Sequence, residues 1–223
     1  MPVYKAPIYK APIYGPTWAG AYIGVNAGYG WGNSSIDVIG DAVTLADFTG
    51  IGIPTSVKVS PKGFLGGATA GYNWQHGKLV YGIEGDFDFA TIKGSGSATA
   101  GVFVNSGAEK IDMFSTVRGR LGYTVWDSFL VYGTGGLAMG HAKLSSSLAD
   151  AVSTDGNSDS KWLVGWTVGA GAEYQLSRSW SVKGEYLYYS LGKIQTSYTV
   201  GPVETVEAQF KGNIVRLGLN YHF

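Results

Sequence analysis

Charged side chains inside otherwise apolar segments are the residues of this chain whose types and spacing best suit a chemical role. Arg118 and Arg120 lie two residues apart in the segment 113–126, so an extended backbone turns both to the same side. Glu84 and Asp86 have the same spacing in the segment 78–92. Guanidinium groups and carboxylates form strong bidentate pairs. We therefore predict a charge network that consists of Glu84, Asp86, Asp88, Arg118, Arg120, Lys183, Glu185 and Arg216.

The segment 113–126 has two unlike faces, because its apolar residues alternate with a list that holds both arginines. A period of two over this length predicts a strand between two different environments. A soluble sandwich would turn the arginines to water, where ion pairs contribute little. We expect the reverse, with the apolar face against lipid and the arginines inside a closed barrel. Counting along the two segments sets Glu84 and Asp86 at about the depth of Arg120 and Arg118.

The sequence shows no pattern that indicates catalysis or metal binding. A nucleophile needs a neighbouring base that a third group orients. His76 lies in an expected short turn, His141 at the base of an expected loop and His222 beside the C-terminus, and none belongs to a recognisable Ser–His–Asp pattern. The histidines lack the spacing of metal ligands, and the chain has no cysteine. We therefore expect a protein that is not an enzyme and holds no metal.

Composition restricts the class of protein. Only 14% of the 223 residues are charged, the formal net charge is zero, and the chain contains 35 glycines and 15 tyrosines. In soluble domains about a quarter of the residues are usually charged. The neutral balance gives no basic surface for nucleic acid. No run approaches the roughly 20 apolar residues that a membrane helix needs, so any membrane crossing must use strands.

Alternating segments separated by turn residues predict eight strands. Long connections at 33–61, 93–110, 141–160 and 191–208 alternate with short turns near 76–77, 127–128 and 176–179. Residues 41–48 in the first connection are compatible with a short helical turn. The expected strands are 18–31, 63–75, 78–92, 113–126, 129–139, 162–174, 180–188 and 215–223.

This plan is that of an all-β, eight-stranded antiparallel up-and-down transmembrane β-barrel with four long extracellular loops and three short periplasmic turns. Aromatic residues near the strand ends, such as Trp18, Trp74 and Trp180, fit two interfacial girdles. The soluble alternative is a lipocalin-like or streptavidin-like barrel, which has its apolar residues inside. With so few charges its exterior would be apolar, and we therefore favour the membrane barrel. Eight strands enclose a lumen that side chains fill, so we expect the charge network to plug it, with selective transport as the alternative.

Residues 1–16 precede the barrel domain, 17–223. They repeat a unit of Val or Ile followed by Tyr-Lys-Ala-Pro. This proline density predicts an extended, polyproline-like periplasmic arm rather than a strand. A spacer and a disordered leftover are both compatible with the pattern.

Several segments together resemble the small outer-membrane barrel proteins of alphaproteobacteria, the porin-family surface antigens related to opacity-type, rhizobial and Brucella-type outer-membrane proteins. They include WAGAYIGVNAGYGWG, GATAGYNWQ, VYGIEGDFDF, VRGRLGY, GWTVGAGAEY and VRLGLNYHF, and the resemblance covers residues 17–223. It implies a protein of the bacterial outer membrane with both termini in the periplasm. The role implied is envelope integrity and contact at the cell surface.

The resemblance also implies partners and site residues. Tyr221 and Phe223 look like the C-terminal signal that the barrel-assembly machinery recognises, and outer-membrane lipid and lipopolysaccharide would surround the barrel. Attachment of the N-terminus to peptidoglycan would give the proline-rich arm a purpose. Some members bind haem, for which His141 near the outer rim is the candidate ligand. A rim histidine without a ligand is the alternative, and no other cofactor is expected.

Overall fold

The computed structural model describes residues 17–39, 50, 56–100, 103–149, 154–198 and 204–223, and its regular elements are β-strands. No helix in these ranges is long and apolar enough to cross a membrane. The strands are β1 (Gly20–Trp31), β2 (Ser34–Ile39), β3 (Ser56–Val59), β4 (Lys62–His76), β5 (Leu79–Ala100), β6 (Phe103–Trp126), β7 (Phe129–Ala149), β8 (Thr154–Gln175), β9 (Trp180–Tyr198) and β10 (Glu204–His222).

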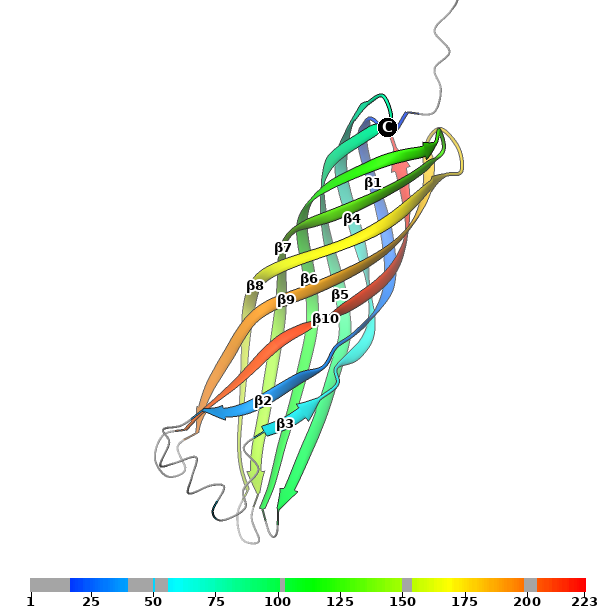
Figure 1. Cartoon of the computed structure of the whole chain (residues 1–223). Helices are drawn as coiled ribbons and strands as arrows, with labels where there is room; N and C mark the ends of the chain where they lie inside the picture. The colour runs from blue at the N-terminus through cyan, green and yellow to red at the C-terminus, as the bar shows by residue number, and fades with distance from the viewer. Residues whose placement is uncertain (1–16, 40–49, 51–55, 101–102, 150–153, 199–203) are drawn as a thin grey trace, which may run out of the picture.

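The long strands close into one antiparallel ring. Their hydrogen-bonded order is β1-β4-β5-β6-β7-β8-β9-β10, and β1 also pairs with β10, where Val25 lies opposite Leu219. Figure 1 shows these strands wound with a strong tilt around a common axis. The predicted eight-stranded antiparallel barrel is confirmed. Closure gives each of these strands a hydrogen-bonding neighbour on both sides around the ring, so the wall there has none of the exposed edges of an open sheet.

The connections β4–β5, β6–β7 and β8–β9 are short, as predicted. In the first of them Gly77 has φ of 59°, a left-handed conformation that favours glycine. The C-terminus lies at the same end of the barrel, where the backbone N–H of Phe223 donates to the carbonyl oxygen of Ala21 at 3.1 Å. We call this end the turn end and the opposite end the loop end.

The strands run further toward the loop end than the apolar pattern indicates. β5 pairs with β6 as far as Ala100 and Phe103, and β7 pairs with β8 as far as Ala149 and Thr154. The prediction of long loops at 93–110, 141–160 and 191–208 was therefore wrong for most of these residues. Backbone pairing in a hairpin needs no apolar face, so strands rich in serine and glycine continue after the alternation of apolar residues has ended.

The predicted loop 33–61 also contains strands. β2 follows β1 and continues the pairing with β10, and β3 pairs with β2 and leads into β4. β1–β2 and β3–β4 are thus the two arms of one bent hairpin, in which β2 and β3 lie toward the loop end (Figure 1). The helical turn predicted at 41–48 and the arm predicted at 1–16 lie outside the described residues.

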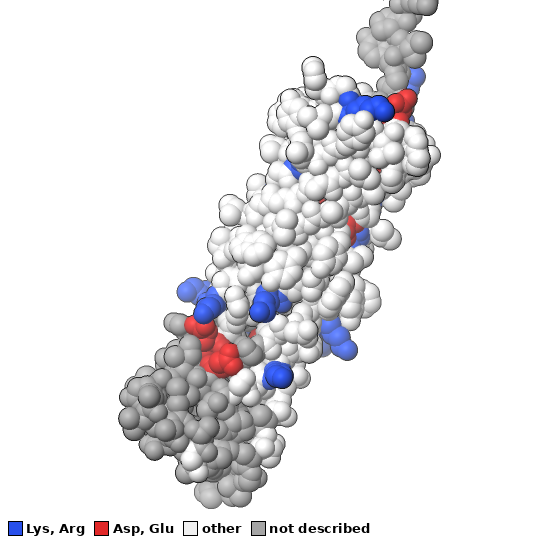
Figure 2. All heavy atoms as spheres, in the orientation of Figure 1, with Lys and Arg blue, Asp and Glu red and all other residues white. Residues whose placement is uncertain are grey.

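The two faces of the wall have the polarity expected from the sequence. Outward-facing Leu121 and Leu217 expose 60% and 66% of their surface, whereas inward-facing Arg118 exposes 1%. On β7, where both alternate lists contain apolar residues, Leu137 faces outward and Tyr132 inward. Figure 2 shows a nearly uncharged middle section with charged groups toward both ends. This arrangement is the one that a barrel surrounded by lipid requires.

The interior is layered along the barrel axis. A charged layer in the middle is covered toward the loop end by a large apolar cluster that includes Phe114, Tyr189 and Ile214. A smaller cluster covers it toward the turn end and consists of Trp18, Val80, Leu130 and Tyr132. Apolar side chains therefore enclose the charges from both sides.

Glycines on the inner face give two tyrosines access to the charged layer. A Cβ atom at Gly71 would lie 2.4 Å from the hydroxyl of Tyr22, and one at Gly171 would lie 2.6 Å from the hydroxyl of Tyr132. Glycine normally weakens a strand, and it is found where a large group comes close to the backbone. The glycine-rich inner face thus makes room for aromatic side chains from neighbouring strands.

Candidate functional site: a charged layer inside the barrel

β5 and β6 supply the first half of the charged layer. Glu84 lies opposite Arg118 in the register, and Asp86 lies opposite Thr116. The count along the sequence, which matches Glu84 with Arg120, was wrong by one inward-facing position. Neighbouring strands of a tilted barrel are staggered along the axis, so equal distances from the strand ends do not mean equal depth.

Arg118 contacts carboxylates on two strands. Its Nη2 atom lies 2.5 Å from Glu84 Oε1 and 3.0 Å from Asp86 Oδ2, and its Nη1 atom lies 3.1 Å from Glu185 Oε1. Its Nε donates to the Thr116 hydroxyl at 2.8 Å. Glu185 belongs to β9, which is not a neighbour of β6 in the ring. The contact with Glu185 therefore crosses the lumen.

Arg216 crosses the lumen from β10. Its Nε donates to Glu185 Oε2 at 2.7 Å, and its Nη2 and Nη1 atoms lie 3.0 Å and 3.2 Å from Asp86 and Asp88. In the ring, β1 and β4 lie between β10 and β5. Arg118 and Arg216 together therefore connect parts of the wall that share no backbone hydrogen bond.

The remaining cations complete the layer. Lys183 Nζ lies 2.6 Å from Glu84 Oε2, and Arg120 Nη2 lies 2.7 Å from Glu173 Oε2. The guanidinium carbon of Arg120 also lies 4.1 Å from the ring centroid of Tyr132, a cation–π contact. The structure thus brings together all of the residues predicted for the network.

Three members of the layer were missed in the sequence. Tyr22 donates to Glu84 Oε2 at 2.7 Å, Tyr132 donates to Glu185 Oε1 at 3.0 Å, and Glu173 binds Arg120. Glu173 lies on the inward list of its own strand, so the alternation already contained a signal for it. The tyrosines carry no charge that would have singled them out.

A serine, a histidine and a carboxylate also meet in this layer, although the sequence shows no such pattern. Ser181 Oγ lies 2.8 Å from His222 Nε2 and donates to Glu173 Oε1 at 2.6 Å, and Glu173 Oε1 lies 3.6 Å from the same His222 nitrogen. In a catalytic triad the carboxylate orients the base through the other ring nitrogen. Ser181 is fully buried, and Arg120 holds Glu173. The three residues form a buried hydrogen-bond network that lacks the geometry of a catalytic triad.

His141 lies apart from the charged layer, on the outer side of β7 toward the loop end. Its Nδ1 atom lies 2.6 Å from Asp112 Oδ1, and its ring centroid lies 5.3 Å from that of Trp162. Asp112 also lies 3.2 Å from Lys143 Nζ. Nδ1 is therefore occupied, and Nε2 is the nitrogen left for a ligand. Among the described residues no group of three or more His, Cys, Asp and Glu could hold a metal ion.

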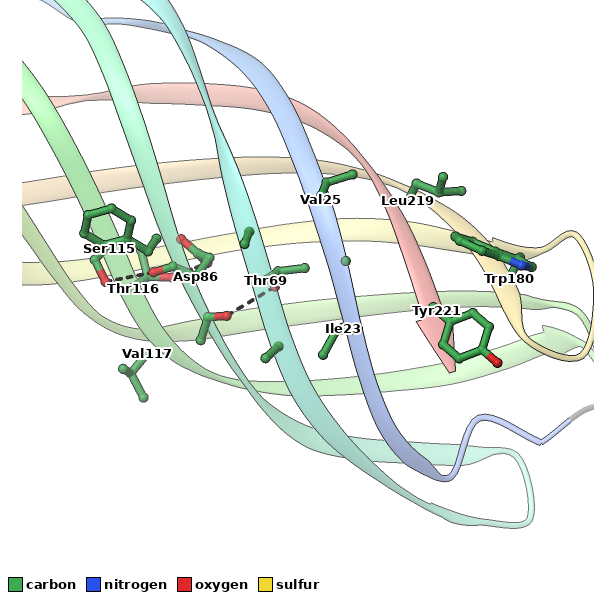
Figure 3. A pocket seen from close by; sticks show the side chains of 15 residues that line it. Ile23, Val25, Thr69, Asp86, Ser115, Thr116, Val117, Trp180, Leu219 and Tyr221 are labelled. Carbon is green, nitrogen blue, oxygen red and sulfur yellow. Dashed lines mark hydrogen bonds between the residues drawn. The ribbon is translucent and has the colours of Figure 1, made fainter. Parts of the chain in front are cut away.

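Tyr221 and Phe223, the predicted assembly signal, face outward at the turn end. They expose 37% and 76% of their surface, and their ring centroids lie 5.3 Å apart. Figure 3 shows Tyr221 and Trp180 at one side of a shallow depression of about 840 Å³ in the outer face. The depression lies over small side chains of the exterior, and its outward-facing lining is mostly apolar. It opens on the outer surface, and Asp86 and Thr116 of the inner face also contribute to its lining.

Glu109 is a buried carboxylate nearer the loop end. It is 2% exposed, its Oε1 atom accepts a hydrogen bond from the Ser34 hydroxyl at 2.5 Å, and its Oε2 atom has no partner among the described residues. Burial raises the pKa of Glu109 to about 7, and the hydrogen bond from Ser34 opposes this shift only in part.

Comparison with known proteins identifies relatives of the whole barrel. Residues 13–223 match the family model described as outer membrane protein beta-barrel domain. A 31 kDa outer-membrane immunogenic protein of Brucella melitensis biotype 1 is 39% identical over 218 residues, which cover 93% of this chain and 84% of that protein. A 22 kDa outer membrane protein of Rhizobium leguminosarum bv. viciae is 34% identical over 161 residues, which cover 72% and 67%. The outer membrane protein OprG of Pseudomonas aeruginosa has the same fold, at 15% identity and a TM-score of 0.56 over 92% of this chain and 96% of that one.

Replacing Arg216 with methionine removes the shared partner of Asp86, Asp88 and Glu185. Because breaking a buried ion pair from one side costs roughly 3–5 kcal/mol, the temperature at which the folded, fast-migrating gel band disappears should fall well below that of the wild type. Arg216→Lys keeps the charge but loses the planar fork, so its effect should be intermediate. Arg178→Met, at an exposed arginine, is the matched control. An Arg216→Met barrel as heat-resistant as this control would contradict the structural role of the layer.

Glu109→Gln should change the pH dependence of stability. The folded carboxyl keeps its proton up to about pH 7, whereas the unfolded group releases it near pH 4.5. Between these values the native state binds more protons, so Glu109 makes the wild type lose stability as the pH rises. The variant lacks this loss, so the midpoint of its heat-induced unfolding should rise relative to that of the wild type between about pH 4.5 and about pH 7 and then stay level. A constant difference between the two proteins would show that Glu109 titrates normally.

Proposed function

The chain belongs to the outer membrane protein β-barrel family, and we propose that it is a structural barrel of the outer membrane whose lumen is closed by its own side chains. The observation that carries this proposal is the pair of cross-lumen arginines, Arg118 and Arg216, between two apolar layers. An eight-stranded barrel has an interior that side chains can fill. In the described layer five carboxylates face four cations, so the charges nearly cancel and give little selectivity for a permeating ion.

We further propose that the turn end faces the periplasm and the loop end faces the outside. Short turns at one end and long hairpins at the other are the usual arrangement of outer-membrane barrels. The Brucella relatives are named immunogenic outer-membrane proteins, which supports a surface-exposed role. Envelope integrity and surface interaction are then the functions of the barrel and of its hairpins. Ser181 and Glu173 both lie beside the same nitrogen of His222, which is not the geometry of a catalytic triad, and this supports a role without catalysis.

The proposed partners follow from this setting. Lipid and lipopolysaccharide would contact the apolar exterior, and the barrel-assembly machinery would recognise Tyr221 and Phe223 at the end of the last strand. The segment 1–16, which lies outside the described residues, would act as a proline-rich spacer toward peptidoglycan.

A closed lumen predicts that the purified barrel conducts poorly. In planar bilayers the wild type should show no steady openings at voltages that open a large water-filled porin, used as the positive control. Heat-unfolded protein gives the background of the measurement. Steady openings of uniform size from the folded wild type would refute the plugged lumen and favour a small-solute porin.

Haem binding at His141 is the second candidate function. The contact of Nδ1 with Asp112 fixes the ring and leaves Nε2 for iron, and Trp162 offers an aromatic surface beside it. Titration of the folded barrel with hemin should then give a saturable Soret shift that His141→Ala abolishes. His76→Ala, at an exposed histidine at the end of β4, should keep the shift. The same response from all three proteins would exclude His141 as the ligand.

A further inference from the structure

Four lysines form a continuous row across four neighbouring strands. Lys62 on β4 lies opposite Lys93 on β5, Lys93 lies opposite Lys110 on β6, and Lys110 lies opposite Lys143 on β7. All four side chains share the outward side of the wall with the exposed apolar residues of their own strands. We call this set the lysine row.

Like charges directly opposite each other on neighbouring strands are destabilising. Lys143 has a partner, because Asp112 lies 3.2 Å from its Nζ atom. Within the described residues no carboxylate lies within 4.0 Å of the Nζ atoms of Lys62, Lys93 or Lys110. Three of these positive charges therefore stand side by side without a carboxylate partner in the part of the chain that the structure describes.

The lysine row lines a groove of about 720 Å³, which also contains serine hydroxyls. Among them, Ser145 and Ser158 lie 3.1 Å apart. Glu109 is the carboxylate along the groove, and it is buried and bonded to Ser34 on the inner side. Ammonium and hydroxyl donors in one groove are suited to an anion with several oxygens, such as a phosphate group.

The groove lies where the apolar exterior ends. Phe64, two residues from Lys62 on the same side of β4, exposes 71% of its surface, and Trp162 at the same end exposes 51%. On the face that it draws, Figure 2 shows basic groups at the loop-end limit of the nearly uncharged section. A cation directly beyond the lipid-facing aromatic residues lies at the depth of lipid headgroups.

We propose that the lysine row binds the phosphate groups of the phosphorylated glycolipid that forms the outer leaflet around the barrel. The inference rests on the proposed orientation of the barrel in the outer membrane, and it assigns a specific lipid-binding site to the loop end of the barrel. The anionic headgroup neutralises the row of like charges, and the acyl chains of the same lipid lie along the apolar wall below. Several lysines engage one headgroup, so binding weakens as salt screens the charges.

The test uses the full chain folded in zwitterionic nanodiscs, with bound lipid counted by native mass spectrometry. The probes are lipid A with two phosphates, dephosphorylated lipid A and inorganic phosphate. Lys93→Gln/Lys110→Gln removes two charges from the row, and Lys78→Gln/Arg178→Gln removes two exposed charges from the turn end. Because each basic residue near an anionic surface adds to the attraction, the first variant should bind phosphorylated lipid A at least about tenfold more weakly. The control should stay within about twofold of the wild type.

Equal binding of phosphorylated and dephosphorylated lipid A, or equal binding by the two variants, would overturn the proposal. Inorganic phosphate that binds as tightly as the lipid would overturn the lipid as the occupant. Heat-modifiable migration and insertion into the bilayer are measured for each protein. A wild type that fails to insert would refute the proposed function itself, whereas an inserted wild type without preference for the phosphorylated lipid would refute only the lysine row as its site.

Discussion

Backbone hydrogen bonding is the constraint on which this structure depends. In hydrocarbon no water is available, so each peptide N–H and C=O group must find its partner within the protein. The pairing of β1 with β10 meets this requirement by joining the first strand of the sheet to the last. The two-residue period follows from the closed wall, because every strand then has one side toward lipid and the other toward a narrow interior. Leu217 and Arg216, adjacent in sequence, therefore occupy opposite environments.

The narrow interior determines how charges can be accommodated. A buried charge is costly unless it is paired and its remaining donors or acceptors are satisfied. Arg118 and Arg216 meet this condition through several carboxylates each, and Tyr22 and Tyr132 add hydroxyl donors. The two apolar clusters above and below exclude water from these contacts. The layer thus holds opposite walls together where the sheet provides no direct hydrogen bond.

The sequence predicted the faces of the strands better than their lengths or register. Alternation assigns Glu84 and Arg118 to one side because only one environment accepts charge. Register depends on how far neighbouring strands are staggered along the barrel axis, and the alternation of residues contains no information about this stagger. The predicted match of Glu84 with Arg120 was wrong for that reason. Past Lys93 the serines and glycines of β5 carry no apolar signal, so backbone pairing there could not be inferred. The alternation on β8 was enough to predict that Glu173 faces inward. Its pairing with Arg120 could not be predicted, because it depends on how β6 and β8 are placed in the closed ring.

The pairing pattern of β5 also fixes how deep the barrel can be immersed. Beyond the Lys62–Lys93 pair, β5 bonds to β6 on one side, while β3 approaches its other side without forming a ladder among the described residues. Gly94 and Gly96 permit this approach, since a Cβ atom there would lie 2.7 Å from Pro61 and 2.2 Å from the carbonyl oxygen of Lys58. Peptide groups along this seam need solvent as their partner. The seam must therefore stay in water. On this side of the barrel the hydrocarbon can extend toward the loop end only as far as the Lys62–Lys93 pair, the last position at which β5 is paired on both sides.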